Sequence, residues 1–194
     1  MSEQAVLIPA TFAVQPVLSS VADRSAIRIE PVTTSVQLAQ TRQLIRDFVA
    51  WIRIRYADRH DLIDTYFGQG ETFERGLDAL PSEFGVPSGR LLLAYCDGQP
   101  AGCVGLRQLD TERCEMKRMY VAERFQGQGI GRALVAALLD RARDIGYRSM
   151  RLDTGPLQTE AQQLYLNMGF QWSEPHYQPP ADLANWLVFM KRDL

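Results

Sequence analysis

The stretch Gln126-Gly127-Gln128-Gly129-Ile130-Gly131-Arg132 decides how this sequence is interpreted. It follows a strand-like segment, Glu112 to Val121, and leads into a helical pattern that ends at Gly146. Glycine accepts positive φ and lets a ligand approach the main chain, and the start of a helix carries about +0.5 charge. Successive N–H groups there can form a concave anion site, which suits a pyrophosphate. The alternative is a tight glycine-rich connection without a ligand.

Apolar spacing predicts the other elements. The turn Asp97-Gly98 joins two apolar runs, 90–96 and 101–108, which indicates a hairpin and the start of an antiparallel meander. Thr33 to Ser35 offer N-caps for a long amphipathic helix that ends near Ala57, and a weaker helix over 71–80 stops at Pro81. We expect further strands at 27–32, 148–154 and 186–190, and a helix at 159–168.

Composition limits the class of protein. The chain has 194 residues, of which 46% are hydrophobic and 23% charged, so we expect one globular domain, residues 26–194, after an irregular N-terminal arm, residues 1–25. The net charge of -2 means that the chain lacks the excess of basic residues that binds nucleic acid, so we expect no nucleic-acid partner. The arm lacks the pattern of a signal peptide, and no apolar run reaches the about 18–20 residues of a membrane span. We therefore expect no membrane partner.

Cysteine and histidine usage predicts neither a metal site nor a disulfide framework. Cys96, Cys103 and Cys114 lack CxxC spacing, and His60 and His176 are the only histidines. This usage fits a reducing, cytoplasmic location.

A dinucleotide-binding fingerprint is one alternative for the glycine stretch. The G-x-G-x-x-G pattern would need glycine at 132, where this chain has Arg132, although Asp153 lies at a tolerable distance for a ribose contact. The preceding strand also comes from a hairpin meander, so the βαβ setting is poor. A dinucleotide-dependent oxidoreductase stays open as an alternative.

Three motifs follow one another along the chain. They are Val121-x-x-x-Phe125-Gln126-Gly127-Gln128-Gly129-Ile130-Gly131-Arg132-Ala133-Leu134, then Arg151-Leu152-Asp153-Thr154, then Ala161-x-x-Leu164-Tyr165-x-x-x-Gly169-Phe170. Together they resemble the GNAT superfamily of N-acetyltransferases, and the order of predicted elements matches that fold. The resemblance implies an α/β (α+β) fold with a mixed, mostly antiparallel central sheet, helices on both faces and a splayed strand pair.

The resemblance further implies an acetyl-CoA site. Backbone groups of Met119, Tyr120 and Val121 would pair with pantetheine beside a bulge in that strand. The loop formed by Gln126, Gly127, Gln128, Gly129, Ile130, Gly131 and Arg132 would hold the pyrophosphate. Gln158 stands where family members often carry asparagine, so its helix-start contact to the cofactor departs from the usual pattern.

Tyr165 is the candidate acid for the leaving thiolate, a role that the family motif implies. A tyrosine pKa of about 10 lies above a thiol pKa of about 8.5, so a strong hydrogen bond can replace full proton transfer. The alternative is a core aromatic, because Tyr165 shares a helical face with Ala161 and Met168.

Glu115 is the candidate base, acting through water, with Glu112 second. Side chains alternate along a strand, so only one of the two faces the cleft, and an unbulged strand puts Glu115 on the side of Lys117 and Met119. One inserted residue would reverse that choice. The alternative is a set of cross-strand charge pairs on a solvated face.

Two other groups have competing interpretations. Cys114 is more typical of a small buried thiol than of a nucleophile. His176 lines the acceptor pocket with Trp172 and Tyr177 or belongs to a surface loop.

These residues predict an N-acetyltransferase that moves acetyl from acetyl-CoA to a primary amine of a small molecule or peptide, directly in a ternary complex. A catalytically inactive CoA-binding sensor is the second alternative. A homodimer is compatible with an N-terminal arm that can pack on a partner chain.

Overall fold

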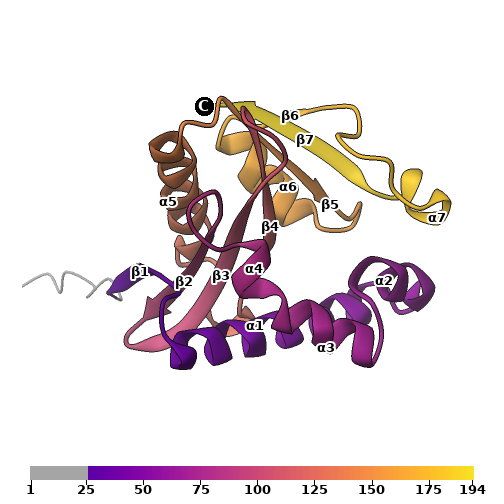
Figure 1. Cartoon of the computed structure of the whole chain (residues 1–194). Helices are drawn as coiled ribbons and strands as arrows, with labels where there is room; N and C mark the ends of the chain where they lie inside the picture. The colour runs from indigo at the N-terminus through magenta and orange to yellow at the C-terminus, as the bar shows by residue number, and fades with distance from the viewer. Residues whose placement is uncertain (1–25) are drawn as a thin grey trace, which may run out of the picture.

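The computed structural model describes residues 26–194, so the predicted N-terminal arm lies outside the described part. Its seven-stranded sheet has the order β1-β2-β3-β4-β5-β7-β6, and β4 and β5 form its parallel pair (Figure 1). The strands are β1 Ile27–Pro31, β2 Arg90–Cys96, β3 Gln99–Gln108, β4 Arg113–Val121, β5 Ser149–Thr154, β6 Gln171–Trp172 and β7 Val188–Asp193. The mixed, mostly antiparallel sheet is as predicted.

Helices cover both faces of the sheet. They are α1 Ser35–Arg55, α2 His60–Phe67, α3 Glu71–Asp78, α4 Leu80–Glu83, α5 Ile130–Ile145, α6 Thr159–Asn167 and α7 Ala181–Ala184, with a 3-10 turn at Glu123–Phe125. Thr34 caps α1 as expected, because its hydroxyl accepts from the Gln37 N–H at 3.2 Å and the Gln37 side chain accepts from the Thr34 N–H.

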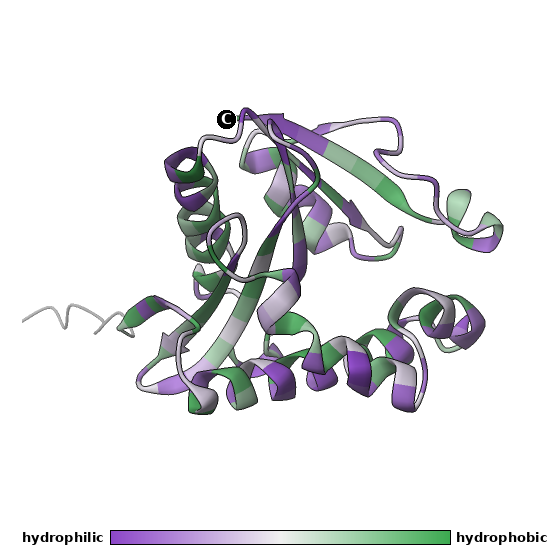
Figure 2. Cartoon of the chain, in the orientation of Figure 1, coloured by the Kyte–Doolittle hydropathy of each residue, from purple (hydrophilic) through white to green (hydrophobic). Residues whose placement is uncertain are grey.

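The core has two layers, one on each face. Leu92 and Ala94 of β2 pack with α5 and α6, whereas Leu91 and Leu93 pack with α1. Burial on both faces explains why this strand is an unbroken apolar run. Figure 2 shows the apolar centre of the sheet in green and polar outer faces on the helices in purple.

The strands β4 and β5 diverge after a short paired stretch. Their pairing runs from Arg113↔Ser149 to Glu115↔Arg151 and includes no later residue of β4. On its other edge β4 pairs with β3, where Lys117 opposes Gly105 but Tyr120 opposes Cys103. One extra residue therefore stands in β4, and Arg118 has a φ of 56° there. The expected bulge and splayed pair are both confirmed.

The structure differs from the sequence prediction in several short elements. Helix α2 was not predicted, and neither were β6 and α7. Pro81 does not end a helix but stands in the first turn of α4, where the N–H that proline lacks would have no helical acceptor in any case. Among the described residues, no helix is both long enough and apolar enough to cross a membrane.

Candidate functional site

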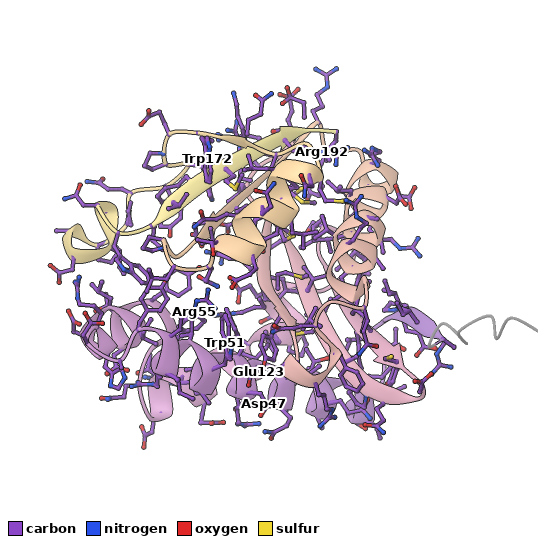
Figure 3. The ribbon with its side chains drawn as sticks, turned by 180° about the vertical axis from the view of Figure 1, so that it is seen from behind. Asp47, Trp51, Arg55, Glu123, Trp172 and Arg192 are labelled. Atoms are coloured by element: carbon purple, nitrogen blue, oxygen red, sulfur yellow. The ribbon has the colours of Figure 1, made fainter. Side chains whose placement is uncertain are left out.

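The largest opening at the splayed strands, here called the cofactor cavity, has a volume of about 420 Å³. It lies between the end of β4, the glycine loop before α5, the start of α6 and one face of α1. Figure 3 labels Trp51 and Arg55 of α1, which line it. Because β4 has left β5 here, its main-chain groups on that edge face the cavity without a partner strand.

The glycine loop has the backbone that an anion site needs. Gly127 and Gly129 have φ values of 76° and 86°, and a Cβ at either position would meet no atom within 4 Å. A side chain would therefore fit at both positions, and glycine is needed for the positive φ and not for lack of space. Gly129 is the N-cap of α5, whose first N–H groups have no intrahelical acceptor.

Most of the predicted cofactor residues line this cavity. They are Met119, Tyr120, Val121, Gln126, Gly127, Gly129, Ile130, Gly131 and Gln158. Gln128 and Arg132 do not. The Gln128 side chain donates instead to the Arg124 carbonyl, and Arg132 is exposed on α5. Their main chain is still part of the glycine loop.

Gln158 has a structural task as well. Its side-chain oxygen accepts from the Gly155 N–H at 2.7 Å and from the Thr154 hydroxyl at 3.2 Å, which fixes the turn from β5 into α6. The amide nitrogen makes no hydrogen bond to any residue of the described range 26–194.

A second, smaller space, here called the transfer cavity, has a volume of about 50 Å³ and shares Phe48, Met119, Gln158 and Tyr165 with the cofactor cavity. Tyr165 therefore stands where the two meet. Its ring is buried, and its hydroxyl has no hydrogen-bond partner within residues 26–194. Burial raises the pKa of Tyr165, so the phenol stays protonated and can donate.

A third space, here called the acceptor cavity, has a volume of about 210 Å³ and shares Tyr66, Lys117 and Arg118 with the transfer cavity. The three spaces therefore form a row, with the transfer cavity in the middle. Ligands in the two outer cavities would therefore both lie next to the transfer cavity.

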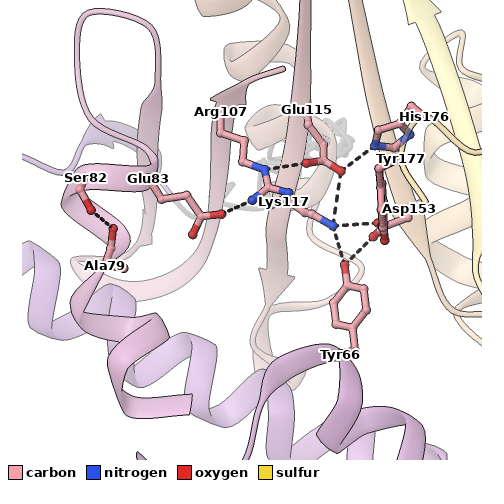
Figure 4. A network of polar contacts seen from close by, with 10 residues as sticks. All are labelled: Tyr66, Ala79, Ser82, Glu83, Arg107, Glu115, Lys117, Asp153, His176 and Tyr177. Atoms are coloured by element: carbon pink, nitrogen blue, oxygen red, sulfur yellow. Dashed lines mark hydrogen bonds and ion pairs between the residues drawn. The ribbon is translucent and has the colours of Figure 1, made fainter. Parts of the chain in front are cut away.

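A buried charge network forms the wall of this row (Figure 4). Asp153 accepts from Lys117 Nζ at 2.7 Å, from the Tyr177 hydroxyl at 2.7 Å and from the Tyr66 hydroxyl. Glu115 accepts from His176 Nε2 at 2.7 Å and from Arg107 Nε at 2.6 Å, and Lys117 Nζ lies 3.4 Å from it. Both carboxylates have an exposed side-chain fraction of 0% and are paired, as buried charges must be.

Glu115 lies behind the cavities and lines none of the three. It shares a side of β4 with Lys117 as expected, but the bulge sends Met119 to the opposite face, into the layer with α5 and α6. Burial opposes its ionisation, yet the hydrogen bond from His176 and the charges of Lys117 and Arg107 prevail and lower the pKa of Glu115 to about 2. A carboxylate held in this way is a poor proton acceptor at neutral pH.

Glu115→Gln is expected to destabilise the fold by about 3 kcal/mol at pH 7, because Arg107, Lys117 and His176 lose their shared anion. The folded pKa lies below the unfolded value of about 4.3. The wild-type stabilisation is therefore present above pH 4.3 and lost as the pH falls toward 2. Urea unfolding across pH measures it.

Glu112→Gln is the matched control, since Glu112 has a side-chain exposure of 64% and its carboxylate pairs only with Arg148, at 3.5 Å, among residues 26–194. It is expected to change stability by less than about 0.5 kcal/mol. Equal urea midpoints for the two variants at pH 7 would show that the network contributes nothing.

Other candidate residues have clear positions. Cys114 is fully buried, and burial raises its pKa to about 12, which agrees with an inert thiol. His176 is buried against Glu115 and does not line the acceptor cavity, whereas Tyr177 does. Trp172 is half exposed and lines none of the three cavities.

Sequence reasoning missed Tyr66, Arg107, Lys117 and Arg118 as residues of the site, and it considered Asp153 only for a ribose contact. Tyr66 lies on the unpredicted α2 and meets Asp153 across 87 residues of sequence. Such pairing has no local signal. The charged run of β4 was the one available hint.

Comparisons with known proteins identify the family of this chain. Residues 49–170 match the model of the acetyltransferase (GNAT) family. An uncharacterised N-acetyltransferase of Schizosaccharomyces pombe is 35% identical over 133 residues, which cover 66% of this chain and 80% of the relative.

Solved structures share the fold. The PaiA N-acetyltransferase of Thermoplasma acidophilum, in complex with coenzyme A, has a TM-score of 0.65 at 15% identity, covering 87% of this chain and 99% of that one. A GNAT acetyltransferase of Elizabethkingia anophelis with acetyl-CoA bound has a TM-score of 0.54 at 23% identity, covering 89% and 99%.

Proposed function

Because the chain belongs to the acetyltransferase (GNAT) family, we propose that it transfers the acetyl group of acetyl-CoA directly to a primary amine of a small molecule or peptide. The observation that carries this proposal is the row of three cavities, with Tyr165 between the first two. Neighbours of the same fold bind coenzyme A or acetyl-CoA, which supports the choice of donor.

The residues of the cofactor cavity fit such a donor. The free edge of β4 at Met119 to Val121 offers main-chain groups to the amide-bearing pantetheine arm. The main-chain N–H groups of Gly127, Gly129 and Gly131 receive the pyrophosphate at the start of α5. Arg55 is held by Glu160 at 2.7 Å, so it closes the wall rather than adding a free charge.

For Tyr165 we propose hydrogen-bond donation to the thiolate that leaves. Its raised pKa makes full proton transfer to a thiolate, whose conjugate thiol has a pKa of about 8.5, unfavourable. A short hydrogen bond from a protonated phenol stabilises the negative charge without that transfer.

For Glu115 we propose a positioning role in place of the predicted base. It fixes Lys117, Arg107 and His176 and thereby the wall next to the acceptor, but it has no path to the amine through the described cavities. The amine then reaches the transfer cavity neutral or loses its proton to water, so the rate rises with pH until the amine is deprotonated.

Calorimetry and a thiol-release assay test the proposal. CoA and acetyl-CoA are expected to bind, with NAD as the control ligand that does not, and thiol release is expected to depend on an added amine. CoA binding without turnover of any amine would indicate the CoA-binding sensor instead. NAD binding without CoA binding would remove the acetyltransferase assignment of the site.

A further inference from the structure

Arg118 stands at the bulge of β4 with a left-handed φ of 56°. This conformation is uncommon for a residue with a side chain, and such outliers cluster at functional sites. The residue lines both the transfer cavity and the acceptor cavity, and its guanidinium lies over the Phe67 ring at 5.3 Å. Arg118 therefore stands between the two spaces.

The neighbouring cations are all neutralised. Arg107 pairs with Glu83 and Glu115, and Lys117 pairs with Asp153 and Glu115. Arg118 makes no ion pair and no side-chain hydrogen bond with any residue from 26 to 194. A half-buried guanidinium offers up to five donors, and an anion is the partner that they match.

The carboxylates beside these cavities, unlike Arg118, are already paired. Glu83, Glu115 and Asp153 each already face a cation. A substrate with a second ammonium group finds no unpaired anion there among residues 26–194, whereas a substrate with a carboxylate finds Arg118. Resting on the function proposed above, we propose that the acceptor is an α-amino acid whose carboxylate binds Arg118.

The cavities accommodate the parts of such a molecule. The transfer cavity of about 50 Å³ has room for a few non-hydrogen atoms, since one water needs about 10–15 Å³. It receives the amino group and the α-carbon. The acceptor cavity receives the side chain against Tyr66, Tyr177 and Leu183. Glu83, Arg107 and Lys117 also line it, but their charges are already paired, so an uncharged side chain fits best.

The transfer balances as follows. The amino nitrogen, after losing one proton to water, forms a bond to the acetyl carbonyl carbon, and the bond between that carbon and sulfur breaks. The second proton leaves the nitrogen and ends on the thiolate. The products are an N-acetyl amino acid, CoA and one proton.

Substrates that differ only in the carboxylate test the proposal. L-phenylalanine and L-leucine are compared with their amides, with phenethylamine and isopentylamine, and with spermidine, at saturating acetyl-CoA. We expect kcat/KM for each acid to exceed that of its amide by about 10–10²-fold. The amide's amino group is less basic and so more often neutral, so any preference for the acid must come from binding.

Arg118→Met removes the guanidinium and leaves the aliphatic stem. The ratio of kcat/KM for acid over amide is expected to fall toward 1, mainly through KM for the acid, and Arg118→Lys is expected to restore part of it. Arg141→Met, on the far surface of α5 and paired with Asp144, is the matched control and keeps the wild-type ratio.

The outcomes separate this inference from the proposed function. Turnover of amides, plain amines or spermidine as efficient as that of the acids, or a ratio unchanged in Arg118→Met, would overturn the inference and leave the acetyltransferase standing. Absence of CoA binding would remove the proposed function. Calorimetry of L-phenylalanine and L-leucine on the CoA-loaded protein decides between them without turnover, and no heat for either acid at millimolar concentration would again overturn the inference.

Discussion

Gly129→Val is expected to weaken the binding of CoA and acetyl-CoA by about 10²–10⁴-fold. The substitution affects the loop in two ways. A β-branched residue resists the φ of 86° at this N-cap, and its methyl groups enter the open space in front of the N–H groups. Two charge-assisted hydrogen bonds lost at about 1.5–3 kcal/mol each give the stated range. Calorimetry with CoA measures it.

Gly98→Val is the matched control for backbone strain. Gly98, in the turn between β2 and β3, has a φ of 77°, and a Cβ there also meets nothing within 4 Å. Both variants should lose similar stability in urea, but only Gly129→Val should lose CoA affinity. Unchanged CoA affinity in Gly129→Val would place the pyrophosphate away from this loop.

The parts of the fold that depend on local sequence pattern could be predicted from the sequence. The dipeptide Asp97-Gly98 predicts the hairpin of β2 and β3 because Asp-Gly suits a turn in which both residues have positive φ, as they do here. The helical spacing of apolar residues predicts α1 and α5 because each helix buries one long face against the sheet. Glycine spacing predicts the turn before α5 because glycine tolerates its positive φ well.

The elements that were missed lack such a signal. Helix α2 has eight residues and no side-chain cap, and its buried residues are Leu62 and Ile63, adjacent along the chain rather than spaced by a helical turn. A short helix of this kind is stabilised by what it packs on, which one sequence does not display. The same reason applies to α7, which packs against α2.

The bulge shows why the site was harder to predict than the fold. One extra residue in β4 reverses the faces of all later side chains, and it occurs at an arginine, which gives no warning of a left-handed backbone. Glu115 and Lys117 lie before it, and Met119 lies after it. The faces expected from strand parity are therefore correct for Glu115 and Lys117 and wrong for Met119.

Tyr165→Phe is expected to lower kcat by about 10–10³-fold with a much smaller change in the KM for acetyl-CoA. The lost hydroxyl stabilises charge that appears on sulfur only as the thioester breaks, while the ring continues to pack against Phe170. Because burial raises the pKa of Tyr165, the wild-type rate should show no loss up to about pH 10 from ionisation of this phenol. Steady-state kinetics across pH measure both effects.

Tyr147→Phe is the control that separates catalysis from packing. Tyr147 is also buried, but its hydroxyl donates to the Ser88 carbonyl at 2.8 Å, and neither residue lines any of the three cavities. Its loss leaves a carbonyl unpaired and is expected to cost about 1–3 kcal/mol of stability with little effect on kcat. Tyr165→Phe should show the reverse, because its hydroxyl has no partner in the described structure to leave behind. If Tyr165→Phe instead keeps the wild-type kcat, Tyr165 is a core aromatic and the leaving thiolate is stabilised by another group.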